Sequence, residues 1–188
     1  MSTDTADAPD FDTLARDYAP LLRRFLQRQV GNPATAEDLL QETLLRVARG
    51  LAGFAGRSSP KTWMFTIASN VAMDHLRQPA QRQQIVDIEE AAQVDDGAIT
   101  VDARMEFDEM NQCVRGVIDS LPPDYRTALI LHDLEDMDCA QTAQVMGLSV
   151  GAAKVRIHRA RARLKAALEQ HCGFYRDSDS VLRCEPRR

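Results

Sequence analysis

The chain has 188 residues, 44% of them hydrophobic, which is enough for one domain or two small ones with modest cores. No apolar run approaches the roughly 18–20 residues of a membrane span, and the polar, acidic start is unlike a signal peptide. The net charge of −5 at pH 7 argues against a nucleic-acid binder unless the basic residues are concentrated in one place. We therefore expect a cytoplasmic protein without membrane insertion, in which the four cysteines are reduced.

The first part of the sequence predicts three helices. Leucines and aromatic residues recur at helical spacing, and Gly31-Asn32-Pro33 separates the first two helices. A loop rich in Gly, Ser and Pro, residues 53–60, precedes the third helix, in which Trp63 and Ile67 are expected to face the core. A small helical domain is thus expected over residues 11–78. Its helices are predicted at residues 11–30, 34–51 and 61–77.

Residues 79–103 are polar, acidic and without periodicity, so they are predicted to form a flexible linker. Helical spacing resumes in a second domain, expected over residues 104–170. The segment Leu121-Pro122-Pro123 interrupts it, and a further helix is predicted over 124–133.

Two helices joined by a tight turn are predicted at the end of the second domain. Asp138 stands three residues before Gln141, which is the spacing of a capping box at a helix N-terminus. Gly147 supplies the left-handed residue that ends this helix, and Ser149 caps the next one. The arrangement is typical of a helix-turn-helix, a DNA-binding motif. The predicted fold class is therefore all-α, with two small helical domains joined by a flexible linker and the second ending in a helix-turn-helix.

The second helix of this motif has two different faces. Ala153, Ile157 and Ala160 recur at helical spacing and predict a buried stripe. The remaining arc is basic, because residues 154–165 carry six Lys or Arg and no acid. Residues 87–138, in contrast, carry fifteen Asp or Glu against three Arg. This asymmetry favours contact of the basic arc with DNA phosphates and base edges.

The tail, residues 171–188, has some strand character on both sides of the turn-forming Ser178-Asp179-Ser180. Cys172 and Cys184 are equidistant from Ser178, so a hairpin centred there would place them opposite each other, within reach of a disulfide. His171 adjoins the pair, but three ligands fall short of a closed zinc site, and no metal is assigned. Three alternatives stay open: a loosely packed tail, a redox- or metal-responsive clip, and a contact for a partner protein.

Motifs of enzymes are not found in the sequence. It has no Gly-rich phosphate loop, no HExxH and no CxxC, and its four histidines lie on separate predicted elements. We therefore expect a protein without catalytic activity and without a cofactor.

Three segments together resemble bacterial sigma factors. Residues 36–46 (AEDLLQETLLR) resemble the helix with which these proteins bind RNA polymerase core, and residues 62–70 (TWMFTIASN) resemble their promoter-melting helix. The break at Leu121-Pro122, followed by the helix-turn-helix and VGAAKVRIHRAR, resembles their reader of the minus-35 element. The resemblance covers residues 11–168, in the order and at the spacing typical of the extracytoplasmic-function group, also called group four.

The resemblance implies binding to RNA polymerase core, through the β′ clamp coiled coil and the β flap, and recognition of promoter DNA. The loop before the third helix is then expected to hold a flipped base, with Phe54 as a stacking surface and Arg57 near phosphate. Trp63 matches a family position, but a lone Trp on a helix is more often buried, and both interpretations stay open. The implied contacts are Asp38, Gln41 and Glu42 for polymerase, Phe54, Arg57, Trp63 and Asn70 for the minus-10 element, and Ser149, Gly151, Ala152, Lys154, Arg156, His158 and Arg159 for the minus-35 element.

The resemblance also implies control by an anti-sigma factor that covers both domains. The alternative is a stand-alone helix-turn-helix transcription regulator that binds DNA without polymerase core, with the N-terminal domain serving dimerisation or ligand sensing. Binding to polymerase core separates the two hypotheses, because only a sigma factor requires it.

Overall fold

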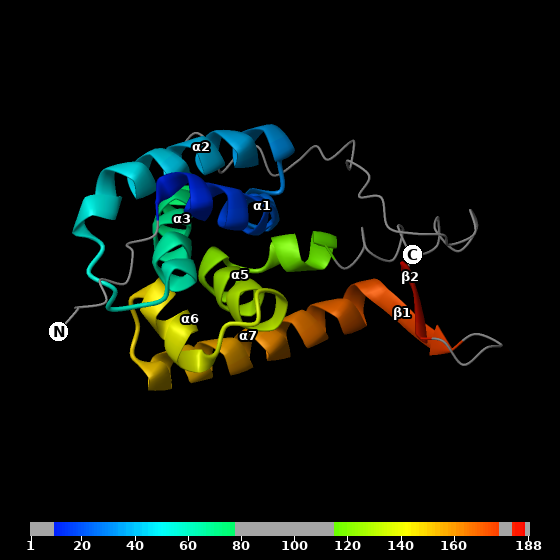
Figure 1. Cartoon of the computed structure of the whole chain (residues 1–188). Helices are drawn as coiled ribbons and strands as arrows, with labels where there is room; N and C mark the ends of the chain where they lie inside the picture. Colours follow the sequence, from blue (N-terminus) through cyan, green and yellow to red (C-terminus); the bar gives the residue numbers. More distant parts are fainter. Residues whose placement is uncertain (1–9, 78–114, 177–181, 187–188) are drawn as a thin grey trace.

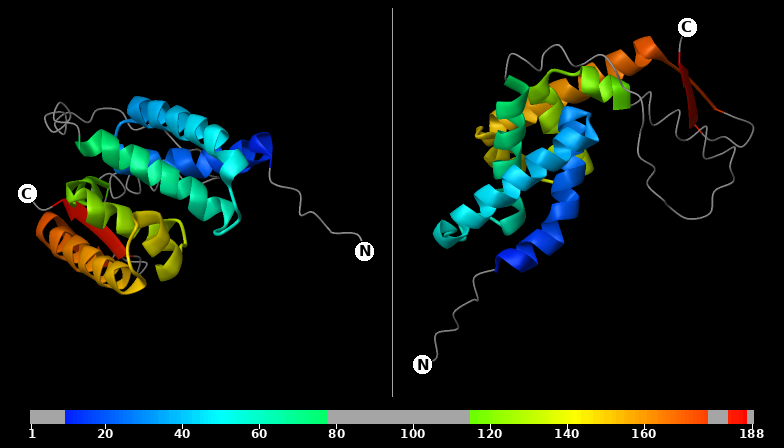
Figure 2. Two further views of the ribbon diagram at one scale, coloured as in Figure 1. Left: turned by 90° about the vertical axis from the view of Figure 1, so that its left-hand side faces the viewer. Right: turned by 90° about the horizontal axis from the view of Figure 1, so that it is seen from above.

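The computed structural model describes residues 10–77, 115–176 and 182–186, without the side chains of 171–172, 174–176 and 182–186. The helices form two layers, seen one above the other in Figure 1 and again edge-on in the left panel of Figure 2. The first layer consists of α1 (Phe11–Val30), α2 (Pro33–Gly50), the short 3-10 turn η1 (Leu51–Gly53) and α3 (Pro60–Arg77). The second consists of α5 (Pro123–Leu129), the π-helical turn η3 (Ile130–Leu134), α6 (Cys139–Met146) and α7 (Val150–His171).

The helices of the first layer begin and end within one residue of their predicted positions, because each boundary carries a local signal. Asp10 caps α1 by accepting a hydrogen bond from the Thr13 amide at 2.9 Å, and Gly31 ends it with a φ of 73°. Asn32 caps α2 by accepting from the Thr35 amide at 2.9 Å. The predicted linker over residues 79–103 lies outside the described residues.

The predicted helix-turn-helix is confirmed in its capping details. The Asp138 carboxylate accepts hydrogen bonds from the amides of Ala140 and Gln141 at 2.7 and 2.8 Å, while the Gln141 side chain accepts from the Asp138 amide at 3.0 Å. This is the reciprocal capping box that the sequence spacing predicts. Gly147 ends α6 in the left-handed conformation, with a φ of 65°.

The predicted buried side of α3 was partly wrong. The fully buried apolar residues of this helix centre on Met64, Phe65 and Ala68, whereas Trp63 and Ile67 are only partly buried and pack at the edge of the core. The helix is buried on two sides, because α1 and α2 pack on it from one direction and α6 from another. Burial on two sides weakens the one-sided periodicity from which a core face is read.

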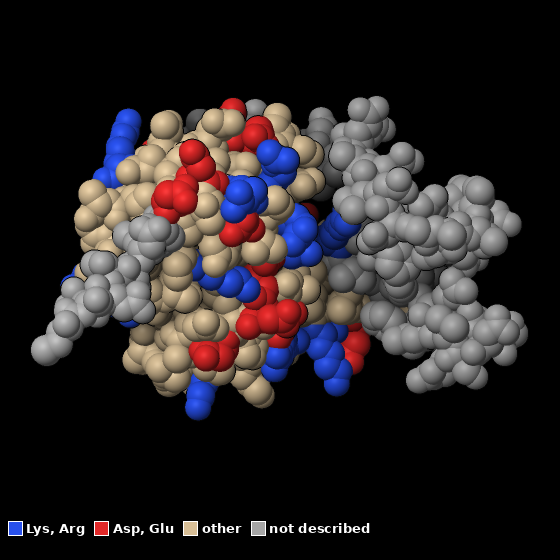
Figure 3. Space-filling model, in the orientation of Figure 1, with Lys and Arg blue, Asp and Glu red and all other residues tan. Residues whose placement is uncertain are grey.

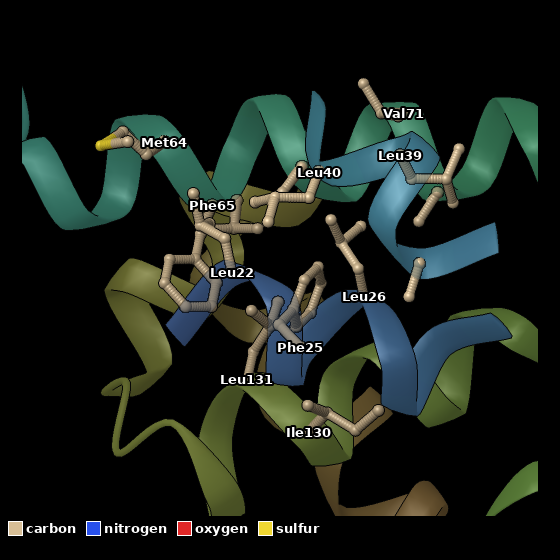
Figure 4. Packing of buried hydrophobic residues seen from close by; sticks show 14 of the residues in the cluster. Leu22, Phe25, Leu26, Leu39, Leu40, Met64, Phe65, Val71, Ile130 and Leu131 are labelled. Atoms are coloured by element: carbon tan, nitrogen blue, oxygen red, sulfur yellow. The ribbon is translucent and has the colours of Figure 1, made fainter. Parts of the chain in front are cut away.

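One cluster of buried apolar residues spans both layers. Leu22, Phe25 and Leu26 of α1 lie at its centre, and Ile130 and Leu131 of η3 belong to the same cluster (Figure 4). The two layers are therefore packed against each other in this structure and do not have fully separate cores. Within the described parts of the chain, no helix combines the length and the apolar character that crossing a bilayer requires.

The tail forms the predicted hairpin, but in a different register. Strand β1 (Cys172–Arg176) pairs antiparallel with β2 (Leu182–Pro186) beyond the end of α7 (Figure 1). Cys172 stands opposite Pro186, and Cys184 stands opposite Phe174. The expectation that Cys172 and Cys184 stand directly opposite each other is therefore wrong. A hairpin centred on Ser178 would pair Cys172 with Cys184, whereas the observed register pairs it with Pro186, two residues further along. Diagonal neighbours lie roughly 7–8 Å apart, which exceeds the usual Cα separation of a disulfide.

Truncating a buried apolar side chain should destabilise the protein far more than truncating an exposed one. The Phe25 ring is fully buried and meets Phe65 edge-on at 5.2 Å, whereas the Leu45 side chain on α2 is 52% exposed. Phe25→Ala should lower the free energy of unfolding by about 3–5 kcal/mol, because it removes buried ring contacts and leaves a cavity. Leu45→Ala should change it by less than about 0.5 kcal/mol. Urea denaturation of both variants checks this, and equal midpoints would contradict the assigned core.

Candidate nucleic-acid and polymerase interfaces

Helix α7 presents a cationic face with a capped N-terminus. The Ser149 hydroxyl accepts a hydrogen bond from the Ala152 amide at 3.2 Å, so the cap expected from the sequence is formed. Ala153, Ile157 and Ala160 are buried, as predicted, while Lys154 and Arg159 are exposed. Lys and Arg side chains project from the lower edge of the molecule in Figure 3, where α7 runs in Figure 1. The exposed arc is available to a DNA backbone.

Not all arginines of α7 are equally available to DNA. Arg156 pairs with Asp124 of α5 at 3.4 Å and keeps only 29% of its side chain exposed. Arg161 donates from Nε to Asp133 at 3.0 Å, and the guanidinium of Arg163 lies 4.2 Å from the centre of the Tyr125 ring. The acidic and aromatic partners lie on α5 and η3, so the segment before the helix-turn-helix holds α7 in place.

A shallow hollow of about 330 Å³ lies beside the N-terminal half of α7. Gly151 and Ala152 have no side chain that reaches beyond Cβ, so they leave room for close approach of a duplex backbone. His158 is exposed further along the same helix, and Val155 exposes 49% of its surface. The hollow is lined by Tyr125, Gly151, Ala152, Val155, Arg156 and Arg159.

The loop before α3 brings two aromatic rings together. Phe54 follows η1, and its ring lies 4.8 Å from the ring of Trp63, tilted by 34°. Trp63 also packs on the end of α2. Its indole lies so close to Gly50 that a Cβ atom at this position would be only 3.2 Å from it. Both rings are partly exposed, so the pair combines packing at the core edge with an accessible aromatic surface. Base stacking on such a surface is independent of sequence.

Asn70 and Arg57 stand on the same part of the chain as this aromatic pair, Asn70 on α3 and Arg57 in the loop before it. Asn70 is exposed on α3 and stands seven residues after Trp63, hence two turns along the same side of the helix. Arg57 is exposed in the loop, one residue after Gly56, whose φ is 65°. The amide of Asn70 can donate and accept, as reading a Watson–Crick edge requires.

Helix α2 carries the polymerase candidates on its outer side. Asp38 and Gln41 are exposed, whereas Glu42 accepts a hydrogen bond from Arg46 at 2.7 Å and is 42% exposed. Arg46 lies 3.7 Å from Asp74 of α3, which fixes this edge of the helix to its neighbour. The opposite side of α2 buries Leu39, Leu40 and Val47 in the core. Acidic and amide side chains on one exposed strip suit a basic partner helix.

The metal or redox candidates of the tail are not brought together as a described site. No cluster of three or more potential metal ligands occurs among the described residues. The side chains of His171, Cys172 and Cys184 lie outside the described part of the structure, and Cys139 of α6 is a free cysteine.

Two family models match the chain, and each covers one helical layer. Residues 14–83 match Sigma-70 region 2, and residues 111–164 match Sigma-70 region 4. The extracytoplasmic-function sigma factor EcfG from Rhodopseudomonas palustris is 35% identical over 164 residues, which cover 85% of this chain and 87% of that protein. The chain belongs to the extracytoplasmic-function sigma factors. The layer α1–α3 is therefore its region 2, and the layer α5–α7 is its region 4.

Other relatives and solved structures agree with this membership. An extracytoplasmic-function sigma factor SigE from Mycolicibacterium smegmatis is 31% identical over 89% of this chain, which spans 65% of that protein's length. The structure of RpoE in complex with the anti-sigma factor NepR, from Bartonella quintana, superimposes with a TM-score of 0.66 at 28% identity, over 85% of this chain and 97% of that one. The structure of CnrH in complex with the cytosolic domain of CnrY has a TM-score of 0.62, at 24% identity, over 85% of this chain and 88% of that one, and supports the fold.

Sequence reasoning missed the residues that link the two regions. Glu135, Gln29 and Arg126 are buried at the junction of region 2 and region 4, although their residue types are usually exposed. Their burial depends on contacts between residues about a hundred positions apart, such as Arg28 with Glu135. No periodicity within one helix reports such a contact.

The aromatic pair predicts a spectroscopic change, because Trp63 is the single tryptophan of the chain. Phe54→Ala removes the ring that covers the indole at 4.8 Å, so the emission maximum of Trp63 should move to longer wavelength as water reaches it. Phe54→Leu keeps an apolar cover and should stay close to the parent. Identical emission maxima in all three proteins would show that the contact does not shield Trp63 in solution.

Proposed function

We propose that this protein is a sigma factor that binds RNA polymerase core and directs promoter recognition and transcription initiation. The observation that carries the proposal is the combination of a capped, cationic recognition helix in region 4 with an aromatic pair beside α3 in region 2. The first suits duplex DNA, and the second suits bases of an opened strand. A protein that only binds duplex DNA has no need of the second surface.

The candidate residues divide among three surfaces. The acidic strip of α2 (Asp38, Gln41 and Glu42) binds the β′ clamp coiled coil. The aromatic surface around Phe54 and Trp63, with Arg57 and Asn70, holds bases and backbone of the minus-10 element. The exposed arc of α7 reads the minus-35 element, while the β flap holds region 4 in place. The candidates are the N-cap residue Ser149, the exposed residues Gly151, Ala152, Lys154, His158 and Arg159 of α7, and the half-buried Arg156.

The regulation we propose follows the solved relatives. RpoE was solved in complex with the anti-sigma factor NepR. CnrH was solved in complex with the cytosolic domain of CnrY. We infer that an anti-sigma factor controls this chain as well. The protein works in the cytoplasm, where polymerase and promoter are, and it contributes specificity without catalysing a reaction itself.

Run-off transcription with purified core polymerase over genomic fragments tests the proposal. Specific transcripts that require both core and this protein are expected. Protection of promoter duplex by the protein alone, without any effect on transcription by core, would instead favour a stand-alone regulator.

Charge reversal on α2 tests the polymerase surface. Asp38→Lys with Glu42→Lys should abolish binding to core, because the strip then repels a basic partner. The melting temperature should change little, because Asp38 is exposed and the solvent-accessible ion pair of Glu42 with Arg46 contributes about 1 kcal/mol or less. The matched control is Asp17→Lys with Glu169→Lys, which alters the net charge equally at exposed positions on α1 and α7. Co-purification of core with the α2 variant at the parent's level would contradict the assignment.

Alanine variants of α7 test the reading of the minus-35 element. Arg159→Ala and Lys154→Ala should each weaken promoter-dependent transcription by roughly 1–3 kcal/mol where base contacts are lost. Arg161→Ala serves as the comparison, since Arg161 is already engaged by Asp133 at 3.0 Å, and its effect should be smaller. Titration of holoenzyme on promoter fragments measures the three effects, and an equal loss for all three would refute the distinction between them.

A further inference from the structure

The outward side of α7 is not basic throughout, because an aliphatic side chain stands in its middle. Val155 lies two residues after Ala153 and two before Ile157, which places it about 200° around the helix from both. Ala153 and Ile157 are buried against the rest of region 4, whereas Val155 is 49% exposed. The line of α7 that is farthest from the core therefore carries a valine and not a cation.

Cations stand on both sides of Val155. Lys154 and Arg156 are its neighbours in the sequence, so they project about 100° to either side of it, and Arg159 follows one turn later, about 40° away. Lys154 and Arg159 are exposed, and Arg156 keeps 29% of its side chain exposed. A helix in a major groove turns its two flanks toward the phosphate backbones and its outermost line toward the base edges. Val155 occupies the line that meets the bases.

A glycine that the fold does not require lies one turn before Val155. Gly151 is exposed, its φ is not in the left-handed range, and a Cβ atom added there would meet no described atom within 4 Å. Glycine weakens a helix relative to alanine, so this position carries a cost without a return inside the protein. The missing side chain therefore serves something that approaches α7 from outside, next to Val155.

The surface beside Val155 is hollowed and can receive part of a base edge. Val155 lines the hollow of about 330 Å³ together with Ala152 and with Tyr125 of α5. The edges that bases present in a major groove consist of hydrogen-bond donors, hydrogen-bond acceptors and one apolar group, the 5-methyl group of thymine. A valine side chain forms no hydrogen bonds, so this methyl group is the part of a base edge that it contacts favourably.

We propose that Val155 reads a thymine of the minus-35 element by packing against its 5-methyl group. The proposal rests on the sigma-factor function proposed above and deepens it. The cations of α7 attract the DNA backbone, and Val155 adds a preference for thymine over cytosine at one position, because cytosine lacks the methyl group. Single exposed aliphatic residues are common on proteins. Val155 differs from them by its place on the outermost line of a cationic helix, beside an otherwise unneeded glycine.

Replacement of thymine by uracil tests the contact, because it removes the 5-methyl group and keeps the hydrogen-bonding edge of the base. The templates carry a promoter recovered in the run-off experiment above, with each thymine of the minus-35 element replaced by uracil in turn, on either strand. Transcription is measured with subsaturating holoenzyme. One of these replacements should lower transcription by the parent about fourfold, as expected for one methyl group that is left in water.

Val155→Ser should make the protein insensitive to that replacement. Its transcription from the thymine and uracil templates should differ less than about 1.5-fold, because serine offers no methyl group to the thymine. Val155→Thr keeps one methyl group and should fall between Val155→Ser and the parent. The melting temperature should stay nearly unchanged in both variants, since the position is exposed and the three residue types have similar helix propensities.

The matched control is Val150→Ser, which makes the same change at the start of the same helix. Val150 is 44% exposed, but it lies about 140° around α7 from Val155 and therefore off the outermost line. Val150→Ser should keep the parent's fourfold difference between the two templates.

Three outcomes would overturn the proposal. If no single uracil replacement lowers transcription by the parent, no thymine methyl group is read. If Val155→Ser loses as much on uracil as the parent does, another residue contacts the methyl group. If Val155→Ser binds core more weakly at an unchanged ratio of the two templates, Val155 belongs to a protein interface. A failure of the proposed function differs from all three, because the parent would then give no promoter-specific transcripts even from thymine templates.

Discussion

Burial of apolar side chains between region 2 and region 4 is the interaction on which the described arrangement depends. Ile130 and Leu131 of η3 belong to the same buried cluster as Leu22 and Phe25 of α1, so the second layer completes the core of the first. The π-helical turn makes this geometry available, because the Glu135 amide bonds the Ile130 carbonyl five residues back and not the carbonyl four back. Asp136 then adopts a φ of 52°, which redirects the chain into the capped start of α6. Backbone irregularity is thus concentrated where the two regions meet.

The three proposed binding surfaces follow from how each helix divides its residues. Helix α2 buries leucines and leaves its acidic strip outside, and α7 buries small residues and leaves its cations outside. Helix α3 differs, because it packs between α1, α2 and α6 and has little free surface. Its exposed residues are Asn70, Asp74 and Arg77, and the partly exposed Trp63 lies beside Phe54 near its start. The least exposed helix is therefore the one with the smallest surface left for its proposed task.

Local features could be predicted from the sequence, and contacts between distant segments could not. The caps at Asp138 and Ser149 and the left-handed Gly147 were predicted, since hydrogen bonds over three residues determine them. The stripe of α7 was predicted because only one side of that helix is packed. The burial of Glu135 and the register of the hairpin escaped prediction, because both depend on pairing between residues that no short-range pattern relates. The candidate contacts themselves came from resemblance, and the structure adds which of them are exposed.

The partners of the α7 cations bear on the thermodynamics of DNA binding. Of the six basic residues in 154–165, Arg156, Arg161 and Lys165 face Asp124, Asp133 and Glu169. Each phosphate that a cation neutralises contributes about 0.9 to the slope of log affinity against log salt, whether or not that cation was paired before. A cation that must first leave a carboxylate, however, gains less free energy from the phosphate, because its ion pair within the protein is lost. Region 4 would then bind promoters with a salt dependence set by the number of its phosphate contacts, but with a lower affinity than that number suggests.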